Sequence, residues 1–189
     1  MLRLMKSKKK RKLILMGLSI VLAACSTKPQ NQQAAEADNV TTETQAEEKI
    51  ENVGDLQLTD MNRDRVSITD ELAKNKITII DFWASWCGPC RQEMPLVVKL
   101  YESHKAQGLG IIGISLDEDY KAWTEAVKEM NMSWPQFSDL RGWDDYVARQ
   151  FGVTAIPHTM VVDQKGNILA RGLRGEELHN FIDQQLGGH

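Results

Sequence analysis

The hydrophobic positions change their spacing repeatedly between residue 53 and the C-terminus. Short apolar runs of the length and composition typical of strands occupy residues 56–58, 66–68, 76–82, 109–115, 136–137, 159–162 and 167–170. Between them, helices are predicted over residues 88–106, 120–131, 144–151 and 175–186, and Trp123, Val127 and Met130 of the second stand at helical spacing. This alternation predicts an α/β fold, with one central mixed sheet and helices on both of its faces.

The first 24 residues follow another pattern. Residues 3–12 carry seven Lys or Arg, and residues 13–24 are apolar apart from Ser19. This run is too short to span about 30 Å of hydrocarbon, but it fits the apolar region of a signal peptide. Leu22-Ala23-Ala24-Cys25 then resembles the lipobox of bacterial lipoproteins, which implies cleavage before Cys25 and lipid attachment to it. The alternative is an ordinary secretory signal peptide with an incidental cysteine.

Residues 25–52 are rich in Gln, Ala, Thr and Glu and contain no aromatic residue. Such a composition cannot bury enough apolar surface to offset the entropy cost of ordering. We therefore expect a disordered tether between Cys25 and a folded domain at residues 53–189. The expected location is the bacterial cell envelope, with the protein lipid-anchored to a membrane and its domain facing the periplasm.

Composition and charge narrow the class of protein. Hydrophobic residues make up 42% of the chain and charged residues 26%, which is typical of a globular domain. Residues 25–189 contain 16 basic and 26 acidic residues, a net charge of −10. Because phosphate contacts need clustered cations, this balance argues against a nucleic-acid partner.

The candidate chemistry lies in Trp86-Cys87-Gly88-Pro89-Cys90, between a predicted strand and a predicted helix. Helix N-terminal amides favour the thiolate of Cys87, and Cys90 lies about one turn later, close enough to form a disulfide. A zinc site needs four ligands, and the sequence has no second Cys pair. A c-type haem needs His after Cys90, where Arg91 stands. We expect no metal and no cofactor beyond a redox-active Cys87–Cys90 disulfide; a purely structural disulfide is the alternative.

The segment from Asp81 to Cys90, which reads Asp-Phe-Trp-Ala-Ser-Trp-Cys-Gly-Pro-Cys, resembles the active site of thioredoxin. Pro95 matches the proline that kinks the family's long helix. Residues 152–157 resemble the segment whose proline, here Pro157, is cis and faces the disulfide. The extra helix and strand between residues 109 and 144, with Arg91-Gln92-Glu93-Met94-Pro95, narrow the resemblance to the TlpA/ResA type of membrane-tethered thiol-disulfide oxidoreductases.

The resemblance covers residues 54–187 and implies a thioredoxin fold with an N-terminal β extension and a central helix-strand insertion. We expect Cys87 to attack the substrate and Cys90 to resolve the mixed disulfide. By resemblance, Asp81 accepts the Cys90 proton through water; the alternative is a strand-end Asp satisfied by backbone donors. The resemblance implies a substrate-contacting surface made of Trp86, Gly88, Pro89, Ile156 and Pro157.

The expected partners are oxidised exported proteins as substrates and a membrane electron donor of the thiol-disulfide type, and we expect a monomer. The sequence departs from the family at two places. Gly88 and Pro89 are those of cytosolic thioredoxin, whereas many cytochrome-maturation members have an acidic residue after the first Cys. His158 follows the proline where thioredoxin has Thr.

Two other function classes stay open. A peroxiredoxin-like peroxidase needs Pro and Thr where this chain has Ile80 and Ala84. A non-catalytic partner-binding or holdase module would use the apolar rim of Trp86 and Pro157. Among the remaining residues, Arg91 and Glu93 are expected to be solvated. Residues expected to pack in the core or the insertion are Trp83, Trp123, Trp134 and Trp143.

Overall fold

The computed structural model describes residues 51–187. The predicted signal peptide (residues 1–24), Cys25 and nearly all of the predicted tether (residues 25–52) lie outside the described residues. In the described part of the chain, every helix is too short or too polar to cross a membrane.

A five-stranded mixed sheet forms the centre of the domain, with the strand order β5-β4-β3-β6-β7. β4 runs parallel to β3 and β5 parallel to β4, whereas β6 is antiparallel to β3 and β7 antiparallel to β6. All residues of β3 are buried, because it lies between β4 and β6 under helices on both faces. The strands are β3 (Ile77–Trp83), β4 (Leu109–Ser115), β5 (Gln136–Phe137), β6 (His158–Asp163) and β7 (Ile168–Arg171).

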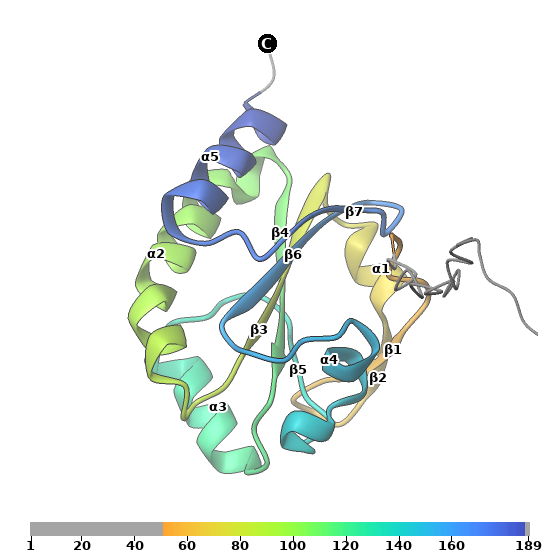
Figure 1. The fold of residues 1–189 in the computed structure, drawn as a ribbon, viewed down its shortest axis with the longest axis vertical. Coiled ribbons are helices and arrows are strands. Elements are labelled where there is room, and N and C mark those ends of the chain that lie inside the picture. Colours follow the sequence, from red (N-terminus) through yellow and green to blue (C-terminus); the bar gives the residue numbers. More distant parts are fainter. Residues whose placement is uncertain (1–50, 188–189) are drawn as a thin grey trace, which may run out of the picture. The chain divides into compact units, whose positions relative to one another are not determined.

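Helices cover both faces of this sheet, as the sequence predicts (Figure 1). α2 and α5 pack side by side on one face, and α1 and α4 lie on the other. α2 contains Pro95 and is the longest helix of the described residues. The bounds are α1 (Ile68–Leu72), α2 (Gly88–His104), α3 (Tyr120–Glu129), α4 (Tyr146–Gln150) and α5 (Gly175–Leu186). Short 3₁₀ turns follow α2 at Lys105–Gln107 and precede α4 at Gly142–Asp144.

The N-terminal β extension is an antiparallel pair, β1 (Gln57–Thr59) and β2 (Arg65–Ser67). The prediction that the second strand includes Ile68 is wrong, because Ile68 begins α1. Its backbone N–H donates to the Leu56 carbonyl at 2.8 Å, and Ile68 and Leu72 are both fully buried. The segment offers a single apolar pair at helical spacing, Ile68 and Leu72, and Ile68 also continues the β-rich run that begins at Val66.

The central insertion is also present, since α3 and β5 lie between β4 and β6 in the chain. Trp83, Trp123 and Trp134 are buried as predicted. The Trp83 indole donates to Gln136 Oε1 at 3.0 Å, across β4, where Gly113 leaves room. A Cβ on Gly113 would lie 2.2 Å from the Gln136 amide oxygen, so this crossing requires glycine. The prediction for Trp143 is wrong, because its side chain is 47% exposed.

Candidate active site

The loop that leaves β3 leads directly into a disulfide at the start of α2. Cys87 and Cys90 are bonded, with their Cα atoms 5.3 Å apart. Cys87 caps the helix, and its Sγ accepts the Cys90 backbone N–H at 3.2 Å. Pro89 in the first turn costs no hydrogen bond, since the first N–H groups of a helix have no intrahelical partner. The helix end is therefore arranged to stabilise negative charge on Cys87 Sγ.

Both cysteines are buried, whereas the residues around them are exposed. Cys87 is 4% exposed and Cys90 2%. Trp86 is 55% exposed, and Gly88 and Pro89 are also exposed. A partner protein would therefore meet this rim before it reached the sulfur atoms.

The Ile156–Pro157 peptide bond is cis, as the resemblance implies. Pro157 precedes β6, whose first residue, His158, pairs with Phe82 near the end of β3. Because Cys87 follows β3 by four residues, the cis proline and the disulfide lie at the same end of the sheet. The predicted substrate-contacting residues Ile156 and Pro157 are both half-buried there.

Asp81 lies on β3 between Gly113 of β4 and Thr159 of β6, and it is 4% exposed. The pKa of this carboxyl is raised from 3.8 to about 7, chiefly by burial and also by the charge of Glu93, whereas the charge of Arg174 acts to lower it. A carboxyl with such a pKa can take up and release a proton at neutral pH, as general acid-base catalysis requires.

Glu93 is not the solvated residue that the sequence predicts. Its side chain is 14% exposed, and its Oε2 lies 2.7 Å from Arg174 Nη2 and 2.8 Å from Arg174 Nε. Its Oε1 accepts the backbone N–H of Gly175 at 3.0 Å. Glu93 thus joins α2 to the start of α5 and places an ion pair near Asp81. Arg91, by contrast, is 42% exposed and pairs with Glu129.

Asp117 is a site residue that the sequence interpretation missed. Its buried carboxylate accepts the Ser85 backbone N–H at 2.9 Å, the Ser85 hydroxyl at 2.5 Å and the Ser115 hydroxyl at 2.7 Å. These bonds hold the loop immediately before Trp86 and Cys87. The available signal was its place two residues after β4, because parallel neighbouring strands end at the same edge of a sheet.

His158 lies on the other face of the sheet from Asp81. It pairs with Phe82 of β3, and the centroids of the two rings are 6.1 Å apart. Because successive residues of a strand point to opposite faces, Phe82 and His158 lie on the face opposite to Asp81. Burial lowers the pKa of His158, and the charge of Arg171 lowers it further. Its Nε2 is buried without a hydrogen-bond partner among the described residues.

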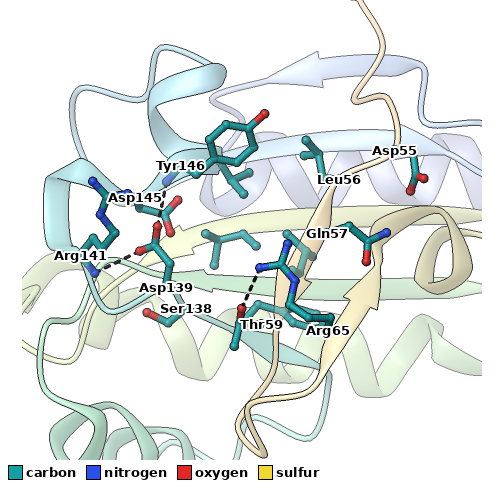
Figure 2. A pocket seen from close by; sticks show the side chains of 14 residues that line it. Asp55, Leu56, Gln57, Thr59, Arg65, Ser138, Asp139, Arg141, Asp145 and Tyr146 are labelled. Carbon is teal, nitrogen blue, oxygen red and sulfur yellow. Dashed lines mark hydrogen bonds between the residues drawn. The ribbon is translucent and has the colours of Figure 1, made fainter. Parts of the chain in front are cut away.

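A separate cavity of about 570 Å³ lies between β1, the end of β5 and α4 (Figure 2). None of the predicted catalytic residues lines it. It contains a second buried carboxyl, Asp145, which is 2% exposed and caps α4 by accepting the Ala148 N–H at 2.8 Å. The Asp145 pKa is raised to about 6, chiefly by burial; the Ala148 N–H acts to lower it and neighbouring Asp139 to raise it. Residues 51–187 contain no group of three His, Cys, Asp or Glu side chains placed to hold a metal ion.

Comparison with known proteins identifies the family to which the chain belongs. The Redoxin family model matches residues 20–185. The thiol-disulfide oxidoreductase ResA of Bacillus thuringiensis subsp. konkukian is 28% identical over 143 residues, which are 74% of this chain and 79% of the relative. The ResA of Bacillus subtilis is 28% identical over 112 residues, which are 59% of this chain and 60% of the relative.

Solved structures agree with these relatives. A thiol-disulfide oxidoreductase from Bacteroides fragilis has a TM-score of 0.67 and 29% identity, over 71% of this chain and 99% of that chain. A thiol:disulfide interchange protein from Bacteroides sp. has a TM-score of 0.63 and 30% identity, over 73% of this chain and 90% of that chain. With its thioredoxin-like fold and its Cys87–Cys90 disulfide, the chain belongs to the Redoxin family and is a thiol-disulfide oxidoreductase of the TlpA/ResA type.

Proposed function

We propose that this oxidoreductase reduces disulfides of exported proteins, with Cys87 as the attacking thiol and Cys90 as the resolving thiol. The observation that carries the proposal is the Cys90 N–H directed at Cys87 Sγ at the start of α2. Only Cys87 receives this amide as a helix cap, and only Cys87 adjoins the exposed Trp86. Cys90 lies within the first turn and is the more buried of the two.

The reduced enzyme would act in two exchange steps. The Cys87 thiolate attacks one sulfur of the substrate disulfide, forming a mixed disulfide and releasing the other substrate sulfur as a thiolate. Cys90 then loses its proton and attacks Cys87 Sγ, which releases the second substrate thiolate and forms the Cys87–Cys90 disulfide. Two electrons pass from the enzyme to the substrate, and a donor dithiol at the membrane restores the reduced enzyme.

Asp81 is proposed to accept the Cys90 proton through water in the second step. Its pKa of about 7 makes the ionised form abundant enough at neutral pH to accept a proton. Trp86, Gly88 and Pro89 would contact the substrate on one side of the disulfide. Ile156 and Pro157 would contact it on the other, with the Ile156 backbone pairing with an extended substrate segment.

We also propose that the protein is exported to the bacterial cell envelope and held at a membrane by lipid on Cys25. The support is the Leu22-Ala23-Ala24-Cys25 sequence after a basic and then an apolar segment. Acyl chains contribute about 0.8 kcal/mol per buried CH₂, so several chains suffice for stable anchoring. Cys25→Ala should release the protein from membranes or block its processing. A wild-type protein recovered in soluble form, with another first residue, would contradict the anchor.

The exchange mechanism is tested with a matched pair of variants. Cys90→Ser should accumulate mixed disulfides with exported proteins, whereas Cys87→Ser should not. By its resemblance to thioredoxin, the wild-type protein should have a potential of about −270 mV in equilibrium with glutathione; a value above about −180 mV would indicate an oxidant or isomerase. Insulin reduction without hydrogen-peroxide consumption separates this function from the peroxidase. It also separates it from the non-catalytic module, which would do neither.

A further inference from the structure

Two exposed tryptophans lie next to the disulfide. Trp86 is 55% exposed and Trp143 is 47% exposed, with their ring centroids 6.3 Å apart and their planes inclined by 55°. Trp86 precedes Cys87 directly, whereas Trp143 belongs to the 3₁₀ turn Gly142–Asp144 beyond the central insertion. Because tryptophans are mostly buried in a folded domain, a pair left open beside a reactive group is a candidate contact surface.

A groove of about 380 Å³ separates this pair from the segment that follows β4. Its charged lining residues are Asp117, Glu118 and Asp119, and no Lys or Arg lines it. Asp117 is occupied by the two serines, and Asp119 caps α3 through the Ala122 N–H at 2.7 Å. Glu118 has no hydrogen bond or ion pair within the described residues.

Glu118 lies beside Gly142, the residue that precedes Trp143. Its carboxylate packs against Gly142, where an added Cβ would come within 2.6 Å of Glu118 Oε1. Gly142 has a φ of +59° and carries no side chain, which permits this approach. An exposed carboxylate therefore lines the same groove as the two indole rings.

Resting on the proposed reduction of protein disulfides, we propose that Trp86, Trp143 and Glu118 bind a cationic side chain, arginine above all, close to the substrate disulfide. A guanidinium stacks on an indole face and forms a fork-like pair with a carboxylate, which a lysine ammonium does less well. The lining carries only negative charge, so the groove is complementary to a cation and disfavours an acidic substrate segment.

The groove is fixed before the substrate arrives. The Asp117 bonds hold Ser85, and Ser85 precedes Trp86 in the same loop. The side chain of Asp119, which also lines the groove, caps the first turn of α3. Binding therefore requires little ordering of the backbone around the groove, and its entropy cost falls on the exposed side chains of Trp86, Trp143 and Glu118.

The test uses the mature full-length protein and four peptides that carry the same disulfide, with Arg, Lys, Ala or Glu beside the attacked cysteine. The wild-type kcat/KM should fall in the order Arg, Lys, Ala, Glu. Trp143→Ala and Glu118→Gln should each reduce the Arg-to-Ala ratio of kcat/KM by about fivefold, as expected for one cation–π contact or one partly exposed ion pair. Tyr146→Ala, which removes another exposed aromatic side chain that does not line the groove, should leave the ratio unchanged.

Each result bears on one proposal. Equal wild-type kcat/KM for the four peptides would overturn the inference, and so would an unchanged ratio in both groove variants. A Trp143→Ala protein that loses activity equally on all peptides would show an unselective apolar contact and would also overturn it. A wild-type protein that reduces neither insulin nor the neutral 4,4′-dithiodipyridine would instead overturn the proposed function.

Discussion

Two buried carboxyls with raised pKa values lie in different parts of this domain. Asp81, on β3 at the disulfide end, has a pKa of about 7, and Asp145, beside the cavity of Figure 2, has a pKa of about 6. In both, burial is the largest cause. Their partners differ: Asp145 accepts an N–H of the helix that it caps, whereas Asp81 responds to Glu93 of α2 and to Arg174, the cap residue of α5.

The comparison shows that a raised pKa does not by itself identify a catalytic acid or base. The Asp145 carboxylate has a structural role within its own segment, because it accepts a backbone N–H at the start of α4 that has no partner within the helix. Asp81 lies on the strand that leads into Cys87 and shares its end of the sheet. Position relative to the sulfur atoms, and not the size of the pKa shift, distinguishes the catalytic role proposed for Asp81 from the capping role of Asp145.

The largest expected effect is on the pH dependence of stability. Between its ordinary pKa of 3.8 and its folded pKa of about 7, Asp81 keeps a proton that the unfolded chain has released. The free energy of unfolding therefore falls as the pH rises through this range, by about 4 kcal/mol for a shift of this size. In urea denaturation, the stability of Asp81→Asn relative to wild type should rise by about this amount from pH 4 to pH 8. A stability difference between the two proteins that does not change with pH would show that folding does not raise the Asp81 pKa.

The second effect concerns turnover. Asp81→Asn should slow insulin reduction by about a hundredfold at pH 7, the lower end of what general acid-base catalysis contributes. The loss should arise in the release of the mixed disulfide, seen by rapid-quench trapping. Asp145→Asn is the matched control and should turn over at the wild-type rate. Equal losses in both variants, or a wild-type rate independent of pH between 6 and 9, would remove the distinction between the two carboxyls.

The third effect concerns Asp145, which is expected to affect stability and not turnover. At pH 4, where Asp145 is protonated in the folded protein, Asp145→Ala should lower the free energy of unfolding by about 1 kcal/mol, because α4 loses its cap. Asp145→Asn keeps an oxygen that can accept the Ala148 N–H and should lose less. Thermal unfolding of the wild type and the two variants at pH 4 measures this difference. An Ala variant as stable as the Asn variant would show that the Ala148 bond does not support the helix.

Local patterns predicted the sheet and the redox centre well. The central strands are continuous apolar runs, and the cysteine pair stands between a strand and a helix, so both could be recognised from neighbouring residues. The cis state of Pro157 came from family resemblance. The pairing of Glu93 with Arg174 joins residues far apart in the sequence, and no local pattern contains it. Trp143 was misplaced because hydrophobicity predicts burial but cannot show where the fold leaves a face uncovered.

The smallest effect tests whether the Glu93–Arg174 pair tunes Asp81 through charge. Glu93→Gln removes a negative charge and should lower the Asp81 pKa, whereas Arg174→Gln removes a positive charge and should raise it. The midpoint in the pH profile of mixed-disulfide release should therefore move in opposite directions in the two variants. The double variant Glu93→Gln/Arg174→Gln should return near the wild-type midpoint, since both opposing charges are gone.

If the pair served only to hold α5 against α2, either single variant would change stability while the midpoint stayed constant. Shifts in the same direction would also exclude a charge effect, because loosened packing would then admit water to Asp81 in both variants.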